Sequence, residues 1–173
     1  MELRKLDPDK HALAVGRVFL AAADYVRMME GTAPGPAQAA GFFMGVPPDC
    51  DITQSVKVGL FEGDSLLCIA DMAFGYPHPG DAYIGLLLCI PEARGKGIGA
   101  AVLALLEEEA RARGATRMYA GVAEANTGGR AFWMRQGFAP LRRVGPVRVG
   151  GKQHMIDRMG KALGKAPAYP SSQ

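Results

Sequence analysis

The sequence predicts an α/β protein in which helices cover both faces of a mixed sheet of mostly antiparallel strands. The first observation is a strand–helix–strand unit over residues 82–123. It requires a right-handed crossover between two parallel strands, which form a central pair. The second observation is a pair of hairpin signals, Gly63-Asp64 and Gly150-Gly151, each between two strand-like segments. Such turns are typical of antiparallel strand pairs.

Length and composition predict one domain. A chain of 173 residues, 49% of them hydrophobic, is long enough to bury a core. We expect residues 1–163 to form this domain, and the Ala-, Pro- and Ser-rich residues 164–173 to form a flexible tail. Charged residues make up 21%, which excludes the disordered class. The net charge of +3 gives no indication of a nucleic-acid or membrane partner.

The sequence shows no signal for membrane insertion or secretion. Its longest clear apolar run, from Ile84 to Ile90, has seven residues, whereas a membrane helix needs about 20. The charged segment from Met1 to Lys10 contains no signal-peptide core. The three cysteines, Cys50, Cys68 and Cys89, are odd in number and lack the spacing of a zinc site. We therefore expect buried free thiols, no metal and a cytoplasmic protein.

The N-terminal third predicts one strand and two helices. Alternation of polar and apolar residues predicts a strand at residues 2–6. Residues 10–29 predict one helix, because apolar residues recur at spacings of three and four. These positions are Val15, Val18, Phe19, Ala22, Val26 and Met29. The breaker cluster at residues 31–35 precedes a second, shorter helix at residues 36–44 and a proline turn at residues 47–49.

The middle of the chain predicts three strands. Residues 56–61 and 66–74 are mostly apolar and are predicted to be strands, and the turn signal Gly63-Asp64 between them makes them the first hairpin. Residues 76–81 contain two prolines and a glycine and are predicted to be a loop. Residues 82–90 form the next strand, which ends at Pro91 because proline lacks an N–H donor.

The C-terminal part predicts two helices and three strands. Residues 98–113 form the clearest helix, with one apolar stripe and charged i, i+4 pairs on its polar side. A strand at residues 116–123 and a short helix at residues 126–136 follow. Residues 138–149 and 152–159 form the last two strands, and this pair provides a surface for a possible homodimer.

A glycine-rich loop, Arg94-Gly95-Lys96-Gly97-Ile98-Gly99, connects a buried strand to the clearest helix. Alternate glycines allow the backbone to curl so that successive N–H groups point inward. The start of the helix adds unpaired N–H groups and the positive end of its dipole. Two cationic side chains add positive charge. The loop therefore predicts a site for a phosphate-containing ligand rather than only a tight turn.

Two other phosphate motifs fit this loop less well. The pattern of a P-loop, which needs Gly-Lys-Ser/Thr, is absent. A dinucleotide-binding fingerprint needs G-x-G-x-x-G, whereas this loop reads G-x-G-x-G. That fingerprint also needs an acid after the next strand, and Glu124 stands there. A dinucleotide-binding oxidoreductase therefore remains an alternative.

The run from Leu87 to Gly99 resembles the acetyl-CoA motif of the GNAT N-acetyltransferase superfamily, which is a strand, Arg/Gln-x-x-Gly-x-Gly/Ala and a helix. The fixed positions hold Arg94, Gly97 and Gly99. Asn126 and the segment from Phe132 to Phe138 resemble the family's Asn…Phe-Tyr-x-x-x-Gly-Phe segment at the same spacing. The resemblance covers residues 56 to about 163, and the first 55 residues only in pattern.

The resemblance implies acetyl-CoA as a co-substrate held between two splayed strands. The pantetheine arm would bond to the main chain near Leu87, and the diphosphate would sit on the amides of the glycine loop. The cofactor-binding residues that it implies are Leu87, Leu88, Cys89, Arg94, Gly95, Lys96, Gly97, Ile98, Gly99, Asn126, Phe132, Trp133 and Arg135. Core packing is the alternative for the aromatic residues, Phe138 above all, and a helix N-cap is the alternative for Asn126.

The catalytic residues are less well indicated than the cofactor site. Trp133 stands where the family often has a tyrosine that protonates the leaving thiolate; an indole is no acid, so we expect packing or cofactor contact. Tyr119 or Tyr83 are possible substitutes. The family's spacing puts the base at Tyr83 and Gly85, and neither is a base near neutral pH. We therefore name Asp81 with Tyr83 as candidates, and Asp71 and His78 as runners-up.

These features predict an enzyme that acetylates the amine of a small molecule by direct attack on the thioester. The acceptor is expected to enter opposite the cofactor, under residues 24–51, where Phe42-Phe43-Met44 suit a small, partly apolar amine. A non-catalytic CoA-binding sensor of the same fold is the alternative, because Trp133 and the missing base depart from the family's pattern.

Overall fold

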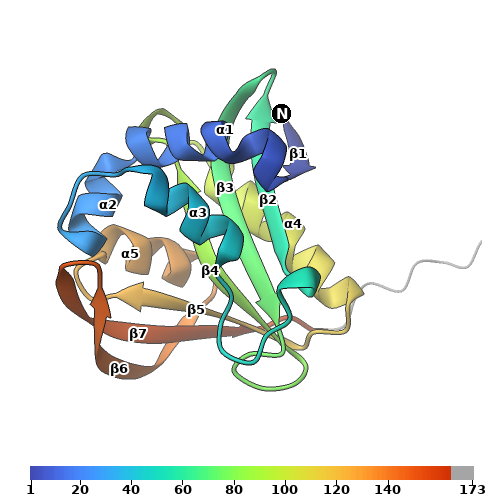
Figure 1. Cartoon of the computed structure of the whole chain (residues 1–173). Coiled ribbons are helices and arrows are strands. Elements are labelled where there is room, and N and C mark those ends of the chain that lie inside the picture. The colour runs from blue at the N-terminus through green and yellow to red at the C-terminus, as the bar shows by residue number, and fades with distance from the viewer. Residues whose placement is uncertain (165–173) are drawn as a thin grey trace, which may run out of the picture.

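The computed structural model of the chain describes residues 1–164, and it has one seven-stranded mixed sheet. The strands are β1 (Glu2–Lys5), β2 (Val56–Glu62), β3 (Ser65–Phe74), β4 (Asp81–Cys89), β5 (Arg117–Ala123), β6 (Ala139–Val149) and β7 (Lys152–Ala162). Their order in the sheet is β1-β2-β3-β4-β5-β7-β6 (Figure 1). Only β4 and β5 pair in parallel among these strands. The predicted fold class is confirmed. Apart from Gly164, the predicted tail lies outside the described residues.

Helices cover both faces of the sheet. They are α1 (Pro8–Ala21), α2 (Ala23–Glu30), α3 (Pro36–Met44), α4 (Ile98–Ala112) and α5 (Thr127–Arg135), and two short 3-10 turns lie at Ile52–Gln54 and Pro91–Ala93. One core holds Val15, Val26 and Phe42 of α1, α2 and α3. The other core packs Leu106 and Trp133 of α4 and α5 on the opposite face. Among residues 1–164, no helix is long and apolar enough to cross a membrane.

The helix predicted over residues 10–29 is wrong in one respect, because it is two helices. Ala22 leaves helical geometry with φ −91° and ψ 37°, and α2 begins at the next residue. The apolar stripe continues through the break, so its periodicity gives no sign of it. The change in direction leads α2 to β7, where His154 bonds to the carbonyl of Met29. This tertiary contact lies 125 residues away in sequence.

The prediction of three free thiols is also wrong. Cys68 of β3 and Cys89 of β4 stand directly opposite each other in the antiparallel pair. Their Cα atoms are 4.0 Å apart, and their sulfur atoms form a disulfide. Cys50 is the free cysteine of the described chain. The pairing follows from the register of β3 with β4, which apolar runs alone do not reveal.

The central parallel pair is short, and this opens the sheet. The pairing of β4 with β5 runs from Asp81 opposite Arg117 to Ile84 opposite Ala120. Beyond Ile84, β4 continues to Cys89 while β5 turns to pair only with β7. The two strands therefore splay at their carboxyl ends, as expected. The backbone of β4 beyond Ile84 has no strand partner on its β5 side.

The α2 helix lies beside this opening and is held by the hairpin of β6 and β7. The ring of His154 lies 2.7 Å from the carbonyl oxygen of Met29 through Nε2. Lys152 donates to the carbonyl of Met28 at 3.3 Å, and the N–H of Gly151 donates to the carbonyl of Glu30 at 2.9 Å. These bonds satisfy carbonyls at the end of the helix, which lack intrahelical partners. They hold α2 beside the end of β4.

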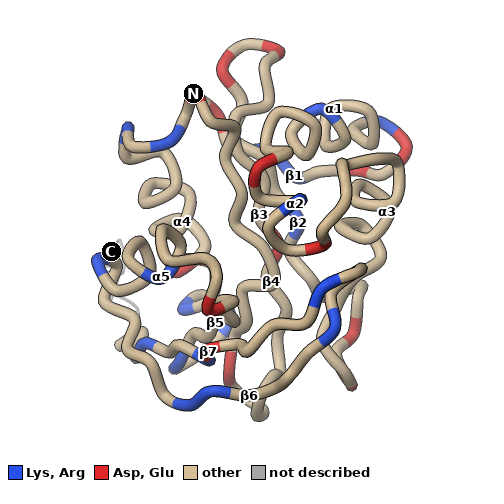
Figure 2. Tube along the Cα trace, turned by 90° about the vertical axis from the view of Figure 1, so that its left-hand side faces the viewer, with Lys and Arg blue, Asp and Glu red and all other residues tan. Residues whose placement is uncertain are grey.

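A charged network joins β6 and β7 to α5. The carboxylate of Asp157, buried on β7, accepts hydrogen bonds from Arg143 at 2.7 Å and 3.2 Å and from Arg130 of α5. Arg143 also donates to Glu124 at 3.2 Å. Figure 2 shows the basic positions along β6. The hydrogen bond from Arg143 is the main reason that the pKa of Asp157 lies below its usual range.

This network predicts a loss of stability in acid. A carboxyl group with a lowered pKa contributes its full stabilisation above its pKa in the unfolded chain, and the contribution disappears as pH falls through the lower folded value. Urea unfolding of the wild type between pH 6 and pH 2 should therefore show a steeper fall in the free energy of unfolding than unfolding of Asp157→Asn. Asp64→Asn, in the exposed hairpin turn, should behave as the wild type. Equal pH dependence in all three proteins contradicts the prediction.

Candidate functional site

A cavity of about 640 Å³ lies at the splayed ends of β4 and β5. It is built from four parts of the chain: the end of β4, the glycine loop with the start of α4, one side of α5, and α2. Most of the predicted cofactor-binding residues line it, namely Leu87, Leu88, Cys89, Arg94, Gly95, Gly97, Ile98, Gly99, Asn126, Phe132, Trp133 and Arg135. Lys96 is exposed and is not among the lining residues.

The glycine loop has the backbone that the sequence predicts. Gly95 and Gly97 have φ angles of 72° and 78°, in the left-handed region that other residues adopt only with strain. A Cβ atom at either position would meet open space, so the backbone conformation, not crowding, requires glycine there. The α4 helix begins at Ile98, and its first N–H groups have no intrahelical partners. The loop therefore presents amide donors to the cavity.

Arg94 is held at the mouth of this cavity. Its Nε donates to the carbonyl of Cys89 at 3.1 Å. Its two terminal nitrogens donate to both carboxylate oxygens of Asp24 on α2, at 2.5 Å and 3.0 Å. The hydrogen bond from Arg94 is the main cause of the lowered pKa of Asp24. Asp24 is thus a fixed negative charge that competes with any anion for this guanidinium.

The opposite wall comes from α5. Asn126 caps this helix, and its side chain accepts from the N–H of Gly129 at 2.9 Å, while it also lines the cavity. Trp133 is 8% exposed and packs edge-on against Phe132 and Phe138, at centroid distances of 5.2 Å and 4.9 Å. Phe138 lies in the core, as core packing predicts. The indole of Trp133 therefore combines packing with a place on the cavity wall.

Residues of α2 line the cavity although the sequence did not indicate them. Asp24, Tyr25 and Met28 reach it from one side of the helix. Burial raises the pKa of Tyr25 to about 12, and the carboxylates of Glu30 and Asp71 add to the rise. Its hydroxyl is therefore protonated at neutral pH and can donate a hydrogen bond. In the sequence, the only sign of this role is that Asp24 and Tyr25 stand beside the apolar stripe of residues 10–29. Nothing in the sequence indicates that Asp24 pairs with Arg94.

A second cavity, of about 350 Å³, lies beside β4. Gly85 lines it, whereas Leu87 of the same strand lines the first cavity, so both cavities meet β4 within two residues. Its walls are mainly apolar and aromatic, and they include the loop that follows α3. The lining residues are Gly45, Val46, Pro47, Pro48, Ser55, Lys57, Asp71, Met72, Ala73, Tyr76, Tyr83 and Gly85.

The second cavity contains a buried ion pair. Nζ of Lys57 on β2 lies 3.6 Å from the carboxylate of Asp71 on β3, and the side chains are 8% and 16% exposed. Lys57 also donates to the carbonyl of Gly45 at 2.9 Å. Burial raises the pKa of Asp71, although Lys57 and nearby backbone N–H groups oppose the rise. The sequence held a signal for this pair, because Lys57 and Asp71 each stand between two apolar residues in strands that form a hairpin.

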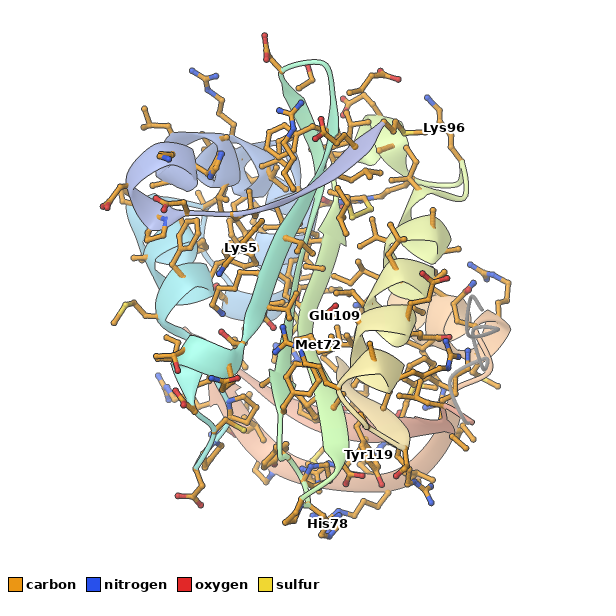
Figure 3. The ribbon with its side chains drawn as sticks, turned by 90° about the vertical axis from the view of Figure 1, so that its right-hand side faces the viewer. Lys5, Met72, His78, Lys96, Glu109 and Tyr119 are labelled. Atoms are coloured by element: carbon orange, nitrogen blue, oxygen red, sulfur yellow. A yellow bond between two sulfur atoms is a disulfide. The ribbon has the colours of Figure 1, made fainter. Side chains whose placement is uncertain are left out.

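The structure separates the two candidate catalytic residues. Tyr83 lines the second cavity, where burial raises its pKa and its ring packs edge-on against Tyr76 at 5.1 Å. Asp81 is buried at the start of β4, where its carboxylate accepts from the backbone N–H of His78 at 3.2 Å and lies 3.1 Å from its ring. Asp81 is absent from the described lining of both cavities. Figure 3 shows His78, which Asp81 contacts, and Lys96 of the glycine loop at opposite ends of the molecule, so Asp81 lies far from the glycine loop.

Comparison with known proteins identifies the family. The model described as the acetyltransferase (GNAT) family matches residues 47–138, more than half of the chain. An acetyltransferase from Thermus thermophilus is 25% identical, with a TM-score of 0.76 over 93% of this chain and 96% of that one. A Salmonella typhimurium protein assigned as an acetyltransferase, solved with its cofactor acetyl-CoA, is 17% identical, with a TM-score of 0.69 over 99% and 98%. No curated protein sequence matches significantly.

The pair of Arg94 and Asp24 leads to a prediction about anion binding. Arg94→Glu should weaken binding of coenzyme A about tenfold or more, because a charge-assisted hydrogen bond is worth roughly 1.5–3 kcal/mol. Asp24→Asn should tighten binding by up to about fivefold, because it removes a competing carboxylate whose exposed pairing is worth at most about 1 kcal/mol. Isothermal titration calorimetry measures both changes. If both variants change the affinity for coenzyme A in the same direction, or neither changes it, Asp24 does not compete with the coenzyme for Arg94.

Proposed function

The chain belongs to the acetyltransferase (GNAT) family, and we propose that it transfers the acetyl group of acetyl-CoA to the amine of a small molecule. The observation that carries this proposal is the cavity of about 640 Å³ at the splay of β4 and β5, with the glycine loop at its end. The family itself supports a CoA-dependent acyltransferase. The amine acceptor and the individual site residues are parts of the proposal.

The donor side of the cavity fits coenzyme A chemically. Amides of the loop from Arg94 to Gly99 would hold the diphosphate, since the start of α4 presents unpaired donors and the positive end of the helix dipole. The pantetheine arm, an amide-containing chain, would bond to the main chain at Leu87–Cys89, which has no strand partner toward β5. Asn126, Phe132 and Arg135 would line its other side.

The reaction that fits these groups is a direct attack. An unprotonated amine attacks the thioester carbonyl carbon, a C–N bond forms, and the C–S bond breaks with departure of the thiolate. Main-chain N–H groups near Leu87 would polarise the carbonyl. Trp133 is no acid, but a thiol pKa near 8.5 makes thiolate an adequate leaving group. Tyr25, which lines the same cavity with its hydroxyl protonated, can stabilise the thiolate by a hydrogen bond.

The acceptor would occupy the second cavity. Its volume of about 350 Å³ is at the lower end for small-molecule sites, which span about 300–1,000 Å³. The apolar and aromatic walls from Val46, Pro47, Met72 and Tyr76 suit a compact, partly apolar body. Of the segment 24–51, under which the acceptor is expected to enter, only residues 45–48 line this cavity, whereas Asp24, Tyr25 and Met28 line the first one. The expectation that Phe42-Phe43-Met44 cover the acceptor is wrong, because Phe42 and Phe43 are buried in the core and Met44 is 74% exposed.

Two departures from the family's pattern favour a second candidate function, a CoA-binding sensor without catalysis. On β4, the positions where the family often has a base hold Tyr83 and Gly85, and the family's tyrosine is replaced by Trp133. A dinucleotide-dependent oxidoreductase is disfavoured, because the acid that it requires, Glu124, pairs with Arg143 and is absent from the described lining of the first cavity. The family match points the same way.

Binding and turnover together test the proposal. Acetyl-CoA at 100 times its Kd should stabilise the protein by about 2.7 kcal/mol, which raises Tm by roughly 5–10 °C for a chain of this size. Incubation with acetyl-CoA and a panel of primary amines should then release CoA, detected as free thiol, above the background without protein. A Tm shift with NAD but not with acetyl-CoA contradicts the proposal. A shift with acetyl-CoA but no CoA release favours the sensor.

A further inference from the structure

We propose that Asp71 of β3 is the general base that deprotonates the acceptor amine, in place of a carboxylate on β4. This inference rests on the proposed function. It starts from Gly85 of β4, which has no side chain, and from the carboxylate of Asp71, which occupies the space that a side chain at Gly85 would fill. Asp71 comes from the neighbouring strand and lines the second cavity with Gly85.

A β-bulge brings the two residues together. In the pairing of β3 with β4, Asp71 stands opposite Leu86 and Met72 opposite Ile84, so Gly85 is the extra residue. A Cβ atom at Gly85 would collide with the carboxylate of Asp71, with Cγ at 3.1 Å. Glycine at this position is therefore what leaves room for the carboxylate. Gly85 is also exposed to the cavity although it lies in a central strand.

The charges around Asp71 suit a proton acceptor. The titratable groups that face it are Lys57 of β2 at 3.6 Å, Tyr25 of α2 and Tyr83 of β4. Lys57, together with the N–H groups of Gly85 and Leu86, favours the charged carboxylate, while burial favours the neutral acid. These opposing influences leave a carboxylate more basic than an exposed one, as a general base near neutral pH requires.

Its position also links the two cavities. Asp71 lines the second cavity, the proposed acceptor cavity, opposite the bulge. Leu87, two residues beyond Gly85, lines the first cavity, the proposed donor cavity for acetyl-CoA. The charge of Asp71 acts on Tyr25, which itself lines the donor cavity. Asp71 therefore stands near the junction where an amine would meet the thioester. Asp81, the candidate from sequence, lies at the other end of β4.

The proton balance of the step is complete. The carboxylate of Asp71 accepts one proton from the ammonium group R–NH₃⁺ and becomes a carboxylic acid. The lone pair of R–NH₂ forms the C–N bond, and the C–S electron pair leaves with the thiolate. The second nitrogen proton is transferred to the thiolate and gives CoA–SH. Asp71 finally releases its proton to water, so that one ammonium ion R–NH₃⁺ and one acetyl-CoA yield one amide, one CoA–SH and one proton.

The test compares Asp71→Asn with the matched control Asp64→Asn, which changes an exposed turn residue. The probe is 2-phenylethylamine with saturating acetyl-CoA, and CoA release is followed from pH 6 to pH 10. Asp71→Asn should lower kcat/KM about 10²- to 10⁴-fold at pH 7, the usual contribution of a general base. Its residual rate should rise about tenfold per pH unit toward the pKa of the amine, because only the free amine reacts, whereas the wild type should level off. Asp64→Asn should match the wild type.

Calorimetry with acetyl-CoA separates the possible failures. Asp71→Asn should bind acetyl-CoA as the wild type does, which shows that it is folded. Wild-type protein that binds acetyl-CoA but releases no CoA with 2-phenylethylamine or the wider amine panel overturns the proposed function, and this inference with it. Wild-type turnover that Asp71→Asn retains within about twofold, with the same pH profile, overturns only the assignment of Asp71.

A second variant keeps the inference testable if Asp71→Asn does not fold. Lys57→Met removes the cation beside Asp71, and an adjacent cation lowers a carboxyl pKa, so its removal raises the pKa of Asp71. The acidic limb of the kcat/KM profile should move to higher pH, while affinity for acetyl-CoA stays unchanged. An acidic limb that does not move overturns Asp71 as the base.

Discussion

The short parallel pairing of β4 and β5 is the constraint on which the rest of the structure depends. The two strands bond from Asp81 to Ile84 and no further. A parallel ladder that continued to Cys89 would saturate the backbone of β4 on both sides. Because it stops, the backbone near Leu87 keeps its donors and acceptors, and both cavities form along this one strand. The glycine loop follows the opened strand after one 3-10 turn at Pro91–Ala93.

The buried pair of Lys57 and Asp71 is poor evidence for stability. The cost of removing two charges from water often equals or exceeds their mutual attraction, and apolar replacements are often neutral or better. The pair lies in a cavity wall, where Gly85 lacks a side chain and its neighbours on β3 and β4 are apolar. The position of the pair is explained better by chemistry than by packing, because it places a largely buried charge on the wall of the second cavity.

The α2 helix connects parts of the molecule that are distant in sequence. One side of it provides Asp24, Tyr25 and Met28 to the donor cavity. Its carboxyl end is held by the hairpin of β6 and β7 through Lys152 and His154. Asp24 also pairs with Arg94 across the cavity mouth. The helix is therefore a wall of the cavity whose position depends on contacts made by the last two strands.

Local features of the sequence determined the elements, the turns and the anion-binding loop. Glycine is required at residues 95 and 97 by the local φ angle alone. Asn126 caps the helix that directly follows it, and the apolar periodicity of a helix depends only on residues within neighbouring turns. Only the tertiary structure decided the break at Ala22, the pairing of Cys68 with Cys89 and the carboxylate of Asp71 over Gly85. Each of these depends on strand register, on a bulge or on a contact more than 100 residues away. Periodicity carries no information on which residues stand opposite one another, so the sequence named Asp71 only as a runner-up, and its place over Gly85 became visible only once the strands were paired.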